Sequence, residues 1–237
     1  MTDISLNTQM RLARLAGAMY LIQIGAGTFS ELVARSPFLV RGDAAQTAHN
    51  IMSSELLFRI GITSDLVTYI SVLIATWALF VLLRPVSQNL ALLALFFRLI
   101  ELSIHFNVTL NSLAALRLLN GAGYLGVIDP ALLQALAQHA IGVQGEGLRL
   151  GFIPLGLGSA LFAYLMLKSR SVPQLLAGWG VFASSLLASF VMVIIVQPSV
   201  GKMLYIPMLP MGIYEVSLGL WLLFRGMKPI TSTAGAA

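Results

Sequence analysis

Long apolar segments separated by short polar connections dominate this chain of 237 residues. Residues 66–83, 150–167 and 171–201 carry no charged side chain. Each run reaches or exceeds the roughly 18 apolar residues that mark a candidate membrane-spanning helix. The runs are continuous and do not alternate with polar residues, which favours helices over the strands of a membrane β-barrel. The pattern therefore predicts an all-α, polytopic bundle of transmembrane helices.

Basic residues and prolines at the ends of the apolar segments divide the chain into six predicted spans. The first span follows Arg11 and Arg14, and the second stops at Arg84. Because six is an even number, both termini are expected on the same side of the membrane. The predicted spans cover residues 15–34, 61–83, 89–119, 148–167, 174–196 and 203–224, within a single integral membrane domain over residues 1–237.

Two longer connections, on the side opposite the termini, carry helix-start signals. Asp43 followed three residues later by Gln46 forms a capping box, in which the carboxylate accepts a backbone N–H and the amide reaches back. Asp129 before a proline predicts another helix start. We therefore expect extracytoplasmic helices over residues 43–60, running on into the second span, and over 130–140, lying on the membrane surface.

The composition agrees with a membrane protein and excludes several other classes. Hydrophobic residues make up 58% of the chain and charged residues only 10%, whereas about a quarter of a soluble domain is charged. The mean hydropathy is +0.89. The chain has no cysteine, which rules out disulfide scaffolds, iron–sulfur clusters, thiolate zinc sites and cysteine nucleophiles.

The net charge of +5 does not indicate nucleic-acid binding, because the basic residues are scattered and serve as anchors at helix ends. Under the predicted topology, more of them lie on the side of the termini than on the other side. The first group is Arg11, Arg14, Arg84, Lys168, Arg170, Arg225 and Lys228, and the second is Arg35, Arg41, Arg117, Arg149 and Lys202. The positive-inside rule then puts both termini in the cytoplasm, for a protein of the cytoplasmic (inner) membrane.

Charged residues inside the predicted spans are the most informative feature of the sequence. Such a group costs at least about 2.5–3.5 kcal/mol at the bilayer centre, so it faces protein or a water-filled cavity. Arg98 and Glu101 are spaced i, i+3 in the third span, and His105 follows Glu101 at i+4, so all three share one helical face. Glu215 lies in the middle of the sixth span.

Two interpretations of these charges stay open. In one, pairs such as Arg98 with Glu101 neutralise each other and hold the bundle together. In the other, they line a polar cavity in the external half of the bundle, where two acids beside one arginine leave a carboxylate for a proton, a cation or a ligand. The candidate ligand-binding residues are Arg98, Glu101, Glu215, His105, Glu55, Arg59, Asp43 and Asn50.

No motif indicates a metal or a cofactor. His49, His105 and His139 lie in three separate predicted elements, so we expect no metal site, and the identity of any cofactor is left unknown. Pro210 lies shortly before Glu215 in the sixth span, and bent or broken helices beside midplane polar groups are typical of transporters. A glycine-rich stretch around residue 154 predicts an interruption of the fourth span as well.

Short motifs in the first half of the chain resemble a known family. They are Ala16-Gly17-Ala-Met-Tyr20, Gly42-Asp43-Ala-Ala-Gln-Thr47-Ala-His-Asn50, Ser54-Glu55-Leu-Leu-Phe58-Arg59 and Phe97-Arg98-Leu-Ile-Glu101. The chain is similar, over most of its length, to the bacterial integral-membrane family named domain of unknown function 4386. The resemblance implies a helical inner-membrane protein and brings no substrate, cofactor or reaction. It also supports treating one group of residues together as functional candidates: Asp43, Asn50, Glu55, Arg59, Arg98 and Glu101.

Three kinds of function are compatible with these features. The first is the binding or translocation of a small polar or amphiphilic ligand, or of protons. The second is a membrane-embedded enzyme acting on a lipid or quinone-like substrate, with Glu101 or His105 as general base and Arg98 stabilising charge. The third is a structural or partner-binding membrane subunit. The expected partners are the lipid bilayer and a small-molecule or lipid ligand, not nucleic acid, and a homo-oligomer is compatible with the sequence.

Overall fold

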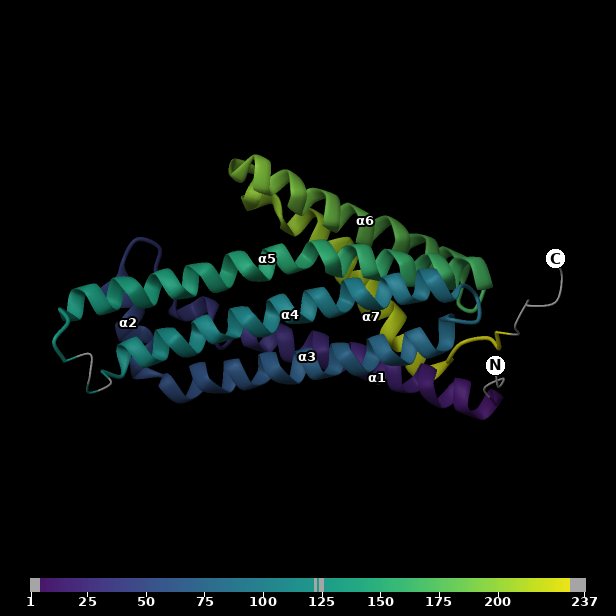
Figure 1. Ribbon diagram of the computed structural model, residues 1–237, viewed down its shortest axis with the longest axis horizontal. Coiled ribbons are helices and arrows are strands. Elements are labelled where there is room, and N and C mark those ends of the chain that lie inside the picture. The colour runs from purple at the N-terminus through teal and green to yellow at the C-terminus, as the bar shows by residue number, and fades with distance from the viewer. Residues whose placement is uncertain (1–4, 122, 124–125, 231–237) are drawn as a thin grey trace. The chain divides into compact units, whose positions relative to one another are not determined.

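The computed structural model describes residues 5–121, 123 and 126–230, and this part of the chain is helical with no strand (Figure 1). The all-α prediction is therefore confirmed. The α-helices are α1 (Leu6–Leu32), α2 (Ala44–Ser53), α3 (Glu55–Leu83), α4 (Gln88–Leu119), α5 (Pro130–Ser169), α6 (Gln174–Val196) and α7 (Tyr205–Phe224). Short 3-10 turns cover Ser36–Phe38 and Pro198–Met203.

Five segments of the described chain are long and apolar enough to cross a membrane. They are α3, α4, α5, α6 and the segment Pro198–Phe224, which contains α7. The helix α1 is not among them, because polar residues along it, among them Arg11, Arg14, Gln23 and Glu31, lower its mean hydropathy. Membrane embedding is thus supported, whereas the sixth predicted span stays a prediction.

The segment predicted as one helix over 43–60 contains a break. The α2 helix ends at Ser53, and Ser54 leaves the helical conformation with φ −135° and ψ 38°. The Ser53 hydroxyl donates to the Asn50 carbonyl at 2.9 Å, the kind of side-chain bond by which serine competes with a continuing helix. The α3 helix then begins at Glu55, whose acidic side chain suits a helix start.

The segments predicted separately over 130–140 and 148–167 belong to one helix of 40 residues, α5. At about 1.5 Å per residue it is roughly 60 Å long. Glu146, in the stretch 141–147 that was expected to be a connection, forms an ion pair at 3.0 Å with Arg149, one turn later at the start of the predicted fourth span. Pro154 lies inside the helix, so the predicted interruption is wrong, although that proline removes one backbone hydrogen bond.

The chain divides into two compact units. The first comprises Met1–Ile22, Ile70–Leu102 and Leu150–Ala237, and the second comprises Gln23–Tyr69 and Ser103–Arg149. Parts of α1, α3, α4 and α5 belong to each unit, whereas α6 and α7 belong to the first and α2 to the second. The single domain expected from the sequence stays a prediction.

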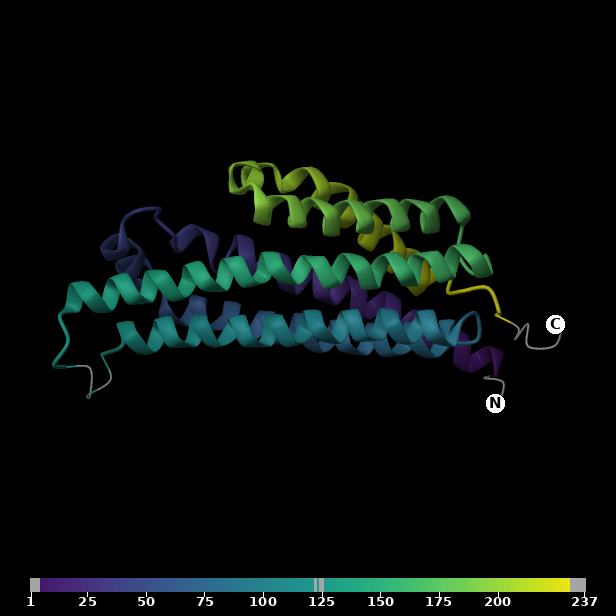
Figure 2. The same ribbon diagram turned by 45° about the horizontal axis from the view of Figure 1, so that its top comes forward.

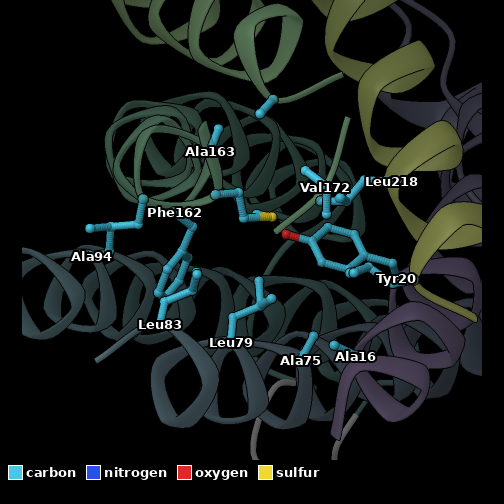
Figure 3. Close-up of a cluster of buried hydrophobic side chains, with 14 of the residues drawn as sticks. Ala16, Tyr20, Ala75, Leu79, Leu83, Ala94, Phe162, Ala163, Val172 and Leu218 are labelled. Atoms are coloured by element: carbon cyan, nitrogen blue, oxygen red, sulfur yellow. The ribbon is translucent and has the colours of Figure 1, made fainter. Parts of the chain in front are cut away.

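The core of the first unit combines small residues with a few large ones. Ala16, Ala75, Ala94 and Ala163, from four different helices, are almost completely buried and let the helices approach closely. Figure 3 shows the ring of Tyr20 extending from α1 into this core, with its hydroxyl pointing toward the interior. The α6 and α7 helices run side by side, joined by the turn Pro198–Met203 (Figures 1 and 2).

Several helix ends meet at one end of the first unit. The backbone N–H of Ile230, beyond α7, donates to Gln9 Oε1 near the start of α1 at 3.2 Å. The backbone N–H of Lys228 donates to the carbonyl of Ser171, in the turn between α5 and α6, at 2.8 Å. The start of α1, the α5–α6 turn and the end of α7 therefore lie together.

The second unit has its own apolar core and well-defined helix starts. Phe38, Ile51, Phe58 and Leu116 are among the side chains buried there. The carboxylate of Asp43 accepts the backbone N–H of Gln46 at 2.8 Å, which confirms the predicted N-cap of α2. The reciprocal half of the capping box does not form, because the Gln46 amide donates to Asn50 Oδ1 at 2.8 Å. Asp129 likewise caps α5 by accepting the N–H of Ala131 at 2.7 Å.

Candidate functional site

The centre of the candidate site is an ion pair buried in the first unit. Arg98 Nη1 lies 2.9 Å from Glu101 Oε2, and the two side chains are only 3% and 1% exposed. Their i, i+3 spacing on α4 puts both on one helical face, which is why the pair could be expected from the sequence. Arg98 also donates to the hydroxyl of Ser159 on α5 at 3.4 Å.

The second carboxylate of the site comes from α7. Glu215 lies within electrostatic range of both Arg98 and Glu101. Its Oε1 atom is enclosed and has no hydrogen-bond partner among the described residues. The structure therefore brings Arg98, Glu101 and Glu215 together, with two carboxylates around one guanidinium.

Two tyrosines that the sequence analysis did not single out complete this cluster. Tyr20 from α1 lies within electrostatic range of Arg98 and of both carboxylates, and Tyr214 from α7 lies within range of Tyr20, Glu215 and Arg98. Both tyrosines are almost fully buried. Tyr20 closes the first of the motifs that resemble the family, and Tyr214 directly precedes Glu215, so position in the sequence was the available signal. We call Tyr20, Arg98, Glu101, Ser159, Tyr214 and Glu215 the polar cluster.

Two glycines make room for the large side chains of the polar cluster. A Cβ atom added at Gly158 of α5 would lie 3.0 Å from the Arg98 side chain and 3.1 Å from the carbonyl oxygen of Ala94. A Cβ added at Gly180 of α6 would lie only 2.3 Å from the ring of Tyr214. The absence of side chains at these positions is therefore what lets Arg98 and Tyr214 occupy the spaces between the helices.

The α7 helix that carries Tyr214 and Glu215 contains Pro210, which cannot donate a backbone hydrogen bond to the preceding turn. Trp179 of α6 donates its Nε1–H to the carbonyl of Pro210 at 3.1 Å. This bond holds the proline-containing turn against α6, one turn before the residues of the polar cluster.

The remaining candidate residues belong to the second unit. His105 is buried, and its ring centroid lies 5.5 Å from that of Tyr69. Tyr69 in turn accepts a hydrogen bond from the Thr109 hydroxyl at 3.2 Å. Glu55 and Arg59 form an ion pair at 2.6 Å on the more exposed start of α3, and Asn120 donates to the same carboxylate at 3.1 Å.

Asp43 and Asn50 have visible structural roles in the second unit. Asp43 caps α2, while the Asn50 amide donates to the carbonyl of Phe38 at 3.4 Å and ties α2 to the preceding turn. Hydrogen bonds of this kind explain both side chains without a ligand. Whether any of the second-unit candidates binds a ligand stays a prediction.

Arg35 forms a buried ionic contact that the sequence analysis did not include among its candidates. It donates to Glu31 at 2.7 Å, to the Ser30 hydroxyl at 3.2 Å and to Asp65 of α3. Burial lowers the pKa of Arg35, but the carboxylates of Asp65 and Glu31 outweigh that effect and raise it above its ordinary value. The guanidinium therefore stays charged and clamps the end of α1 to α3.

Two pockets in the structure lie apart from the polar cluster. One, of about 400 Å³, lies in the second unit and is lined by residues of α2, α4 and α5 that include His49 and Gln134. The other, of about 430 Å³, runs along α7 and is lined by residues such as Met208 and Gly212. Neither is lined by Arg98, Glu101 or Glu215, so a cavity at the polar cluster stays a prediction.

The apolar helices and the charges enclosed between them define a polytopic helical membrane protein. The chain belongs to the family described as domain of unknown function (DUF4386), whose model matches residues 15–226. No curated protein matches the chain. No solved structure matches it either.

Proposed function

We propose that this protein binds and translocates protons by means of the polar cluster, with Glu215 as the group that takes up and releases the proton. The single observation that carries this proposal is the imbalance of charge, because one guanidinium, Arg98, faces two carboxylates, Glu101 and Glu215. Among the described residues of the first unit, Arg98 is the only buried cation, so no second positive charge balances the second carboxylate.

Burial makes this imbalance costly. A charge that is removed from water and left without a partner costs several kcal/mol, and a proton on a carboxylate removes that cost. Glu101 is the partner of Arg98 at 2.9 Å, which leaves the charge of Glu215 to be neutralised. A bound proton or cation does so, and a proton needs the least space.

The close packing around the polar cluster favours a proton over a small polar or amphiphilic molecule. Arg98, Glu101, Tyr20 and Tyr214 are each 3% exposed or less, and both pockets lie elsewhere. The tyrosine hydroxyls can both donate and accept hydrogen bonds, so they suit a path along which protons pass between neighbours.

Translocation needs an element that responds to the proton, and α7 is suited to that role. The charge on Glu215 determines how strongly α7 is attracted to Arg98 of α4. Pro210, about one turn before Glu215, makes α7 easier to bend. Bent helices next to buried polar groups are a recurring feature of transporters. Uptake of a proton would therefore loosen α7 from α4, and release would draw it back.

We further propose that the chain crosses the inner membrane six times, with both termini in the cytoplasm. The meeting of the α1 start with the α7 end, through Ile230 and Gln9, supports an even number of crossings, so α1 is the sixth span. Basic residues gather at the same end, which under the positive-inside rule is cytoplasmic. Counted from the cytoplasmic ends of α4, α5 and α7, Arg98, Ser159 and Glu215 lie about 14–15 Å deep, so the polar cluster lies around the midplane of the membrane.

The test is proton flux into liposomes that contain the purified protein and an entrapped pH-sensitive dye. A pH gradient is imposed, and the rate of internal acidification is compared among the wild type, Glu215→Gln and the control Glu146→Gln, which alters an exposed carboxylate. We expect the wild type and the control to acidify faster than protein-free liposomes and Glu215→Gln to match the protein-free rate. Equal rates for the wild type and Glu215→Gln would overturn the proposal, as would a wild type no faster than protein-free liposomes.

A further inference from the structure

One end of the first unit carries a group of basic residues without acidic neighbours. We call these residues the basic ring; they are Arg11, Arg14, Arg84, Lys168, Arg170, Arg225 and Lys228. Six of them are exposed, and Arg84 is partly buried. The described carboxylates of the first unit, Glu101 and Glu215, both belong to the polar cluster. Within the described chain, therefore, no carboxylate of this unit is placed to neutralise the ring.

The fold holds these charges together. The bond from the Lys228 N–H to the Ser171 carbonyl joins the end of α7 to the turn that follows Arg170. The bond from the Ile230 N–H to Gln9 joins the same segment to the start of α1, close to Arg11. These contacts bring together the segments that carry Arg11, Arg170 and Lys228, although their like charges repel.

Arg170, just after the end of α5, occupies an unfavourable backbone conformation. Its φ of 51° lies in the left-handed region. It is the one residue other than glycine with a positive φ in the described chain. Glycine or asparagine ordinarily occupies such a position after a helix. The chain instead carries an exposed cation there, at a conformational cost.

Exposed apolar side chains lie within five residues of the basic ring in the sequence. Leu175 at the start of α6 is 86% exposed, and Phe224 at the end of α7, next to Arg225, is 70% exposed. Cations beside exposed apolar groups match the two parts of a phospholipid, the phosphate and the acyl chain. Free phosphate or nucleic acid would not account for the apolar part.

We propose that the basic ring is a binding site for anionic phospholipids, with the phosphate groups held by Arg170, Lys228 and their neighbours and the acyl chains lying against Leu175 and Phe224. Such binding depends on the number of basic residues and weakens with salt. This proposal is independent of proton translocation, since no residue of the polar cluster takes part in it.

The test measures lipid retained by the full-length protein in mixed micelles that contain phosphatidylcholine and phosphatidylglycerol. Native mass spectrometry gives the preference for phosphatidylglycerol in the wild type and in the double variant Arg170→Asn with Lys228→Gln. Asparagine is chosen at 170 because it tolerates the left-handed conformation. The matched control is Arg41→Gln with Lys202→Gln, which also removes two exposed cations.

We expect the wild type and the control to prefer phosphatidylglycerol, and the preference to fall as salt is added. The ring variant should lose roughly 30-fold in preference, which corresponds to about 1 kcal/mol for each of its two missing charges. The variant Arg170→Lys should retain the preference. The proposal is overturned if the wild type retains both lipids equally or if the control loses as much as the ring variant.

Discussion

The guanidinium of Arg98 and the carboxylate of Glu101 lie 2.9 Å apart, one helical turn from each other on α4, and both side chains are enclosed by protein. Glu215 approaches the same guanidinium from α7. Arg98 is therefore the shared partner of two carboxylates, and the two partners are not equivalent. One is fixed on the same helix, and the other arrives on a separate helix that contains a proline.

The unequal roles predict unequal effects on stability. Arg98→Met removes the guanidinium that two buried carboxylates share and should lower the free energy of unfolding by about 3–5 kcal/mol. Glu101→Gln should cost less, because Glu215 remains within range of Arg98. Denaturant unfolding in mixed micelles provides the comparison, with the exposed Arg149→Gln as control, for which we expect about 1 kcal/mol or less. An effect of Arg98→Met no larger than that of the control would show that the pair is not buried as described.

Substitution of Gly180 should destabilise the protein, whereas the same substitution at Gly178 should not. Gly180→Ala puts a Cβ against the ring of Tyr214, and overpacking of this kind costs about 1–3 kcal/mol. Gly178→Ala, on the same helix, meets nothing within 4 Å and should be neutral or stabilising, since alanine favours helix. The same unfolding experiment compares the two. Equal stabilities of the two variants would contradict the packing of Tyr214 against α6.

The clamp between α1 and α3 gives a prediction for the second unit. Arg35→Met leaves Asp65 buried without its cation and should destabilise the protein by about 3–5 kcal/mol. The double variant Arg35→Met with Asp65→Leu removes both charges and should recover most of that loss. Exchange of backbone hydrogens, followed residue by residue, locates the effect, and we expect faster exchange around the end of α1. Failure of the second substitution to restore stability would mean that the ion pair is not the source of the loss.

Much of the fold and part of the site could be predicted from particular residues. The uncharged runs fix the long helices, and α6 at Gln174–Val196 has the bounds predicted for the fifth span. The pairing of Arg98 with Glu101 follows from helical spacing alone. Glu215 could be singled out because a carboxylate in an apolar segment is costly, although its neighbour Arg98 is far away in the sequence.

What the sequence did not reveal depends on packing between distant segments. Tyr20 and Tyr214 were missed because an uncharged hydroxyl on an apolar ring does not disturb the hydrophobic pattern. Gly158 reads as a helix breaker in the sequence, whereas in the structure it provides the space for Arg98 inside a continuous helix. The break at Ser54 was also missed, because serine is only mildly unfavourable within a helix.

The most direct test of the polar cluster is infrared spectroscopy of the protein in lipid nanodiscs as the pH is raised. A protonated carboxylic acid has a carbonyl stretch that disappears when the proton leaves. We predict such a pH-dependent band in the wild type and in the control Glu146→Gln, and its loss in Glu215→Gln, where Arg98 and Glu101 balance each other. A wild type without the band, or the same band in Glu215→Gln, would contradict a proton held by two carboxylates around one arginine.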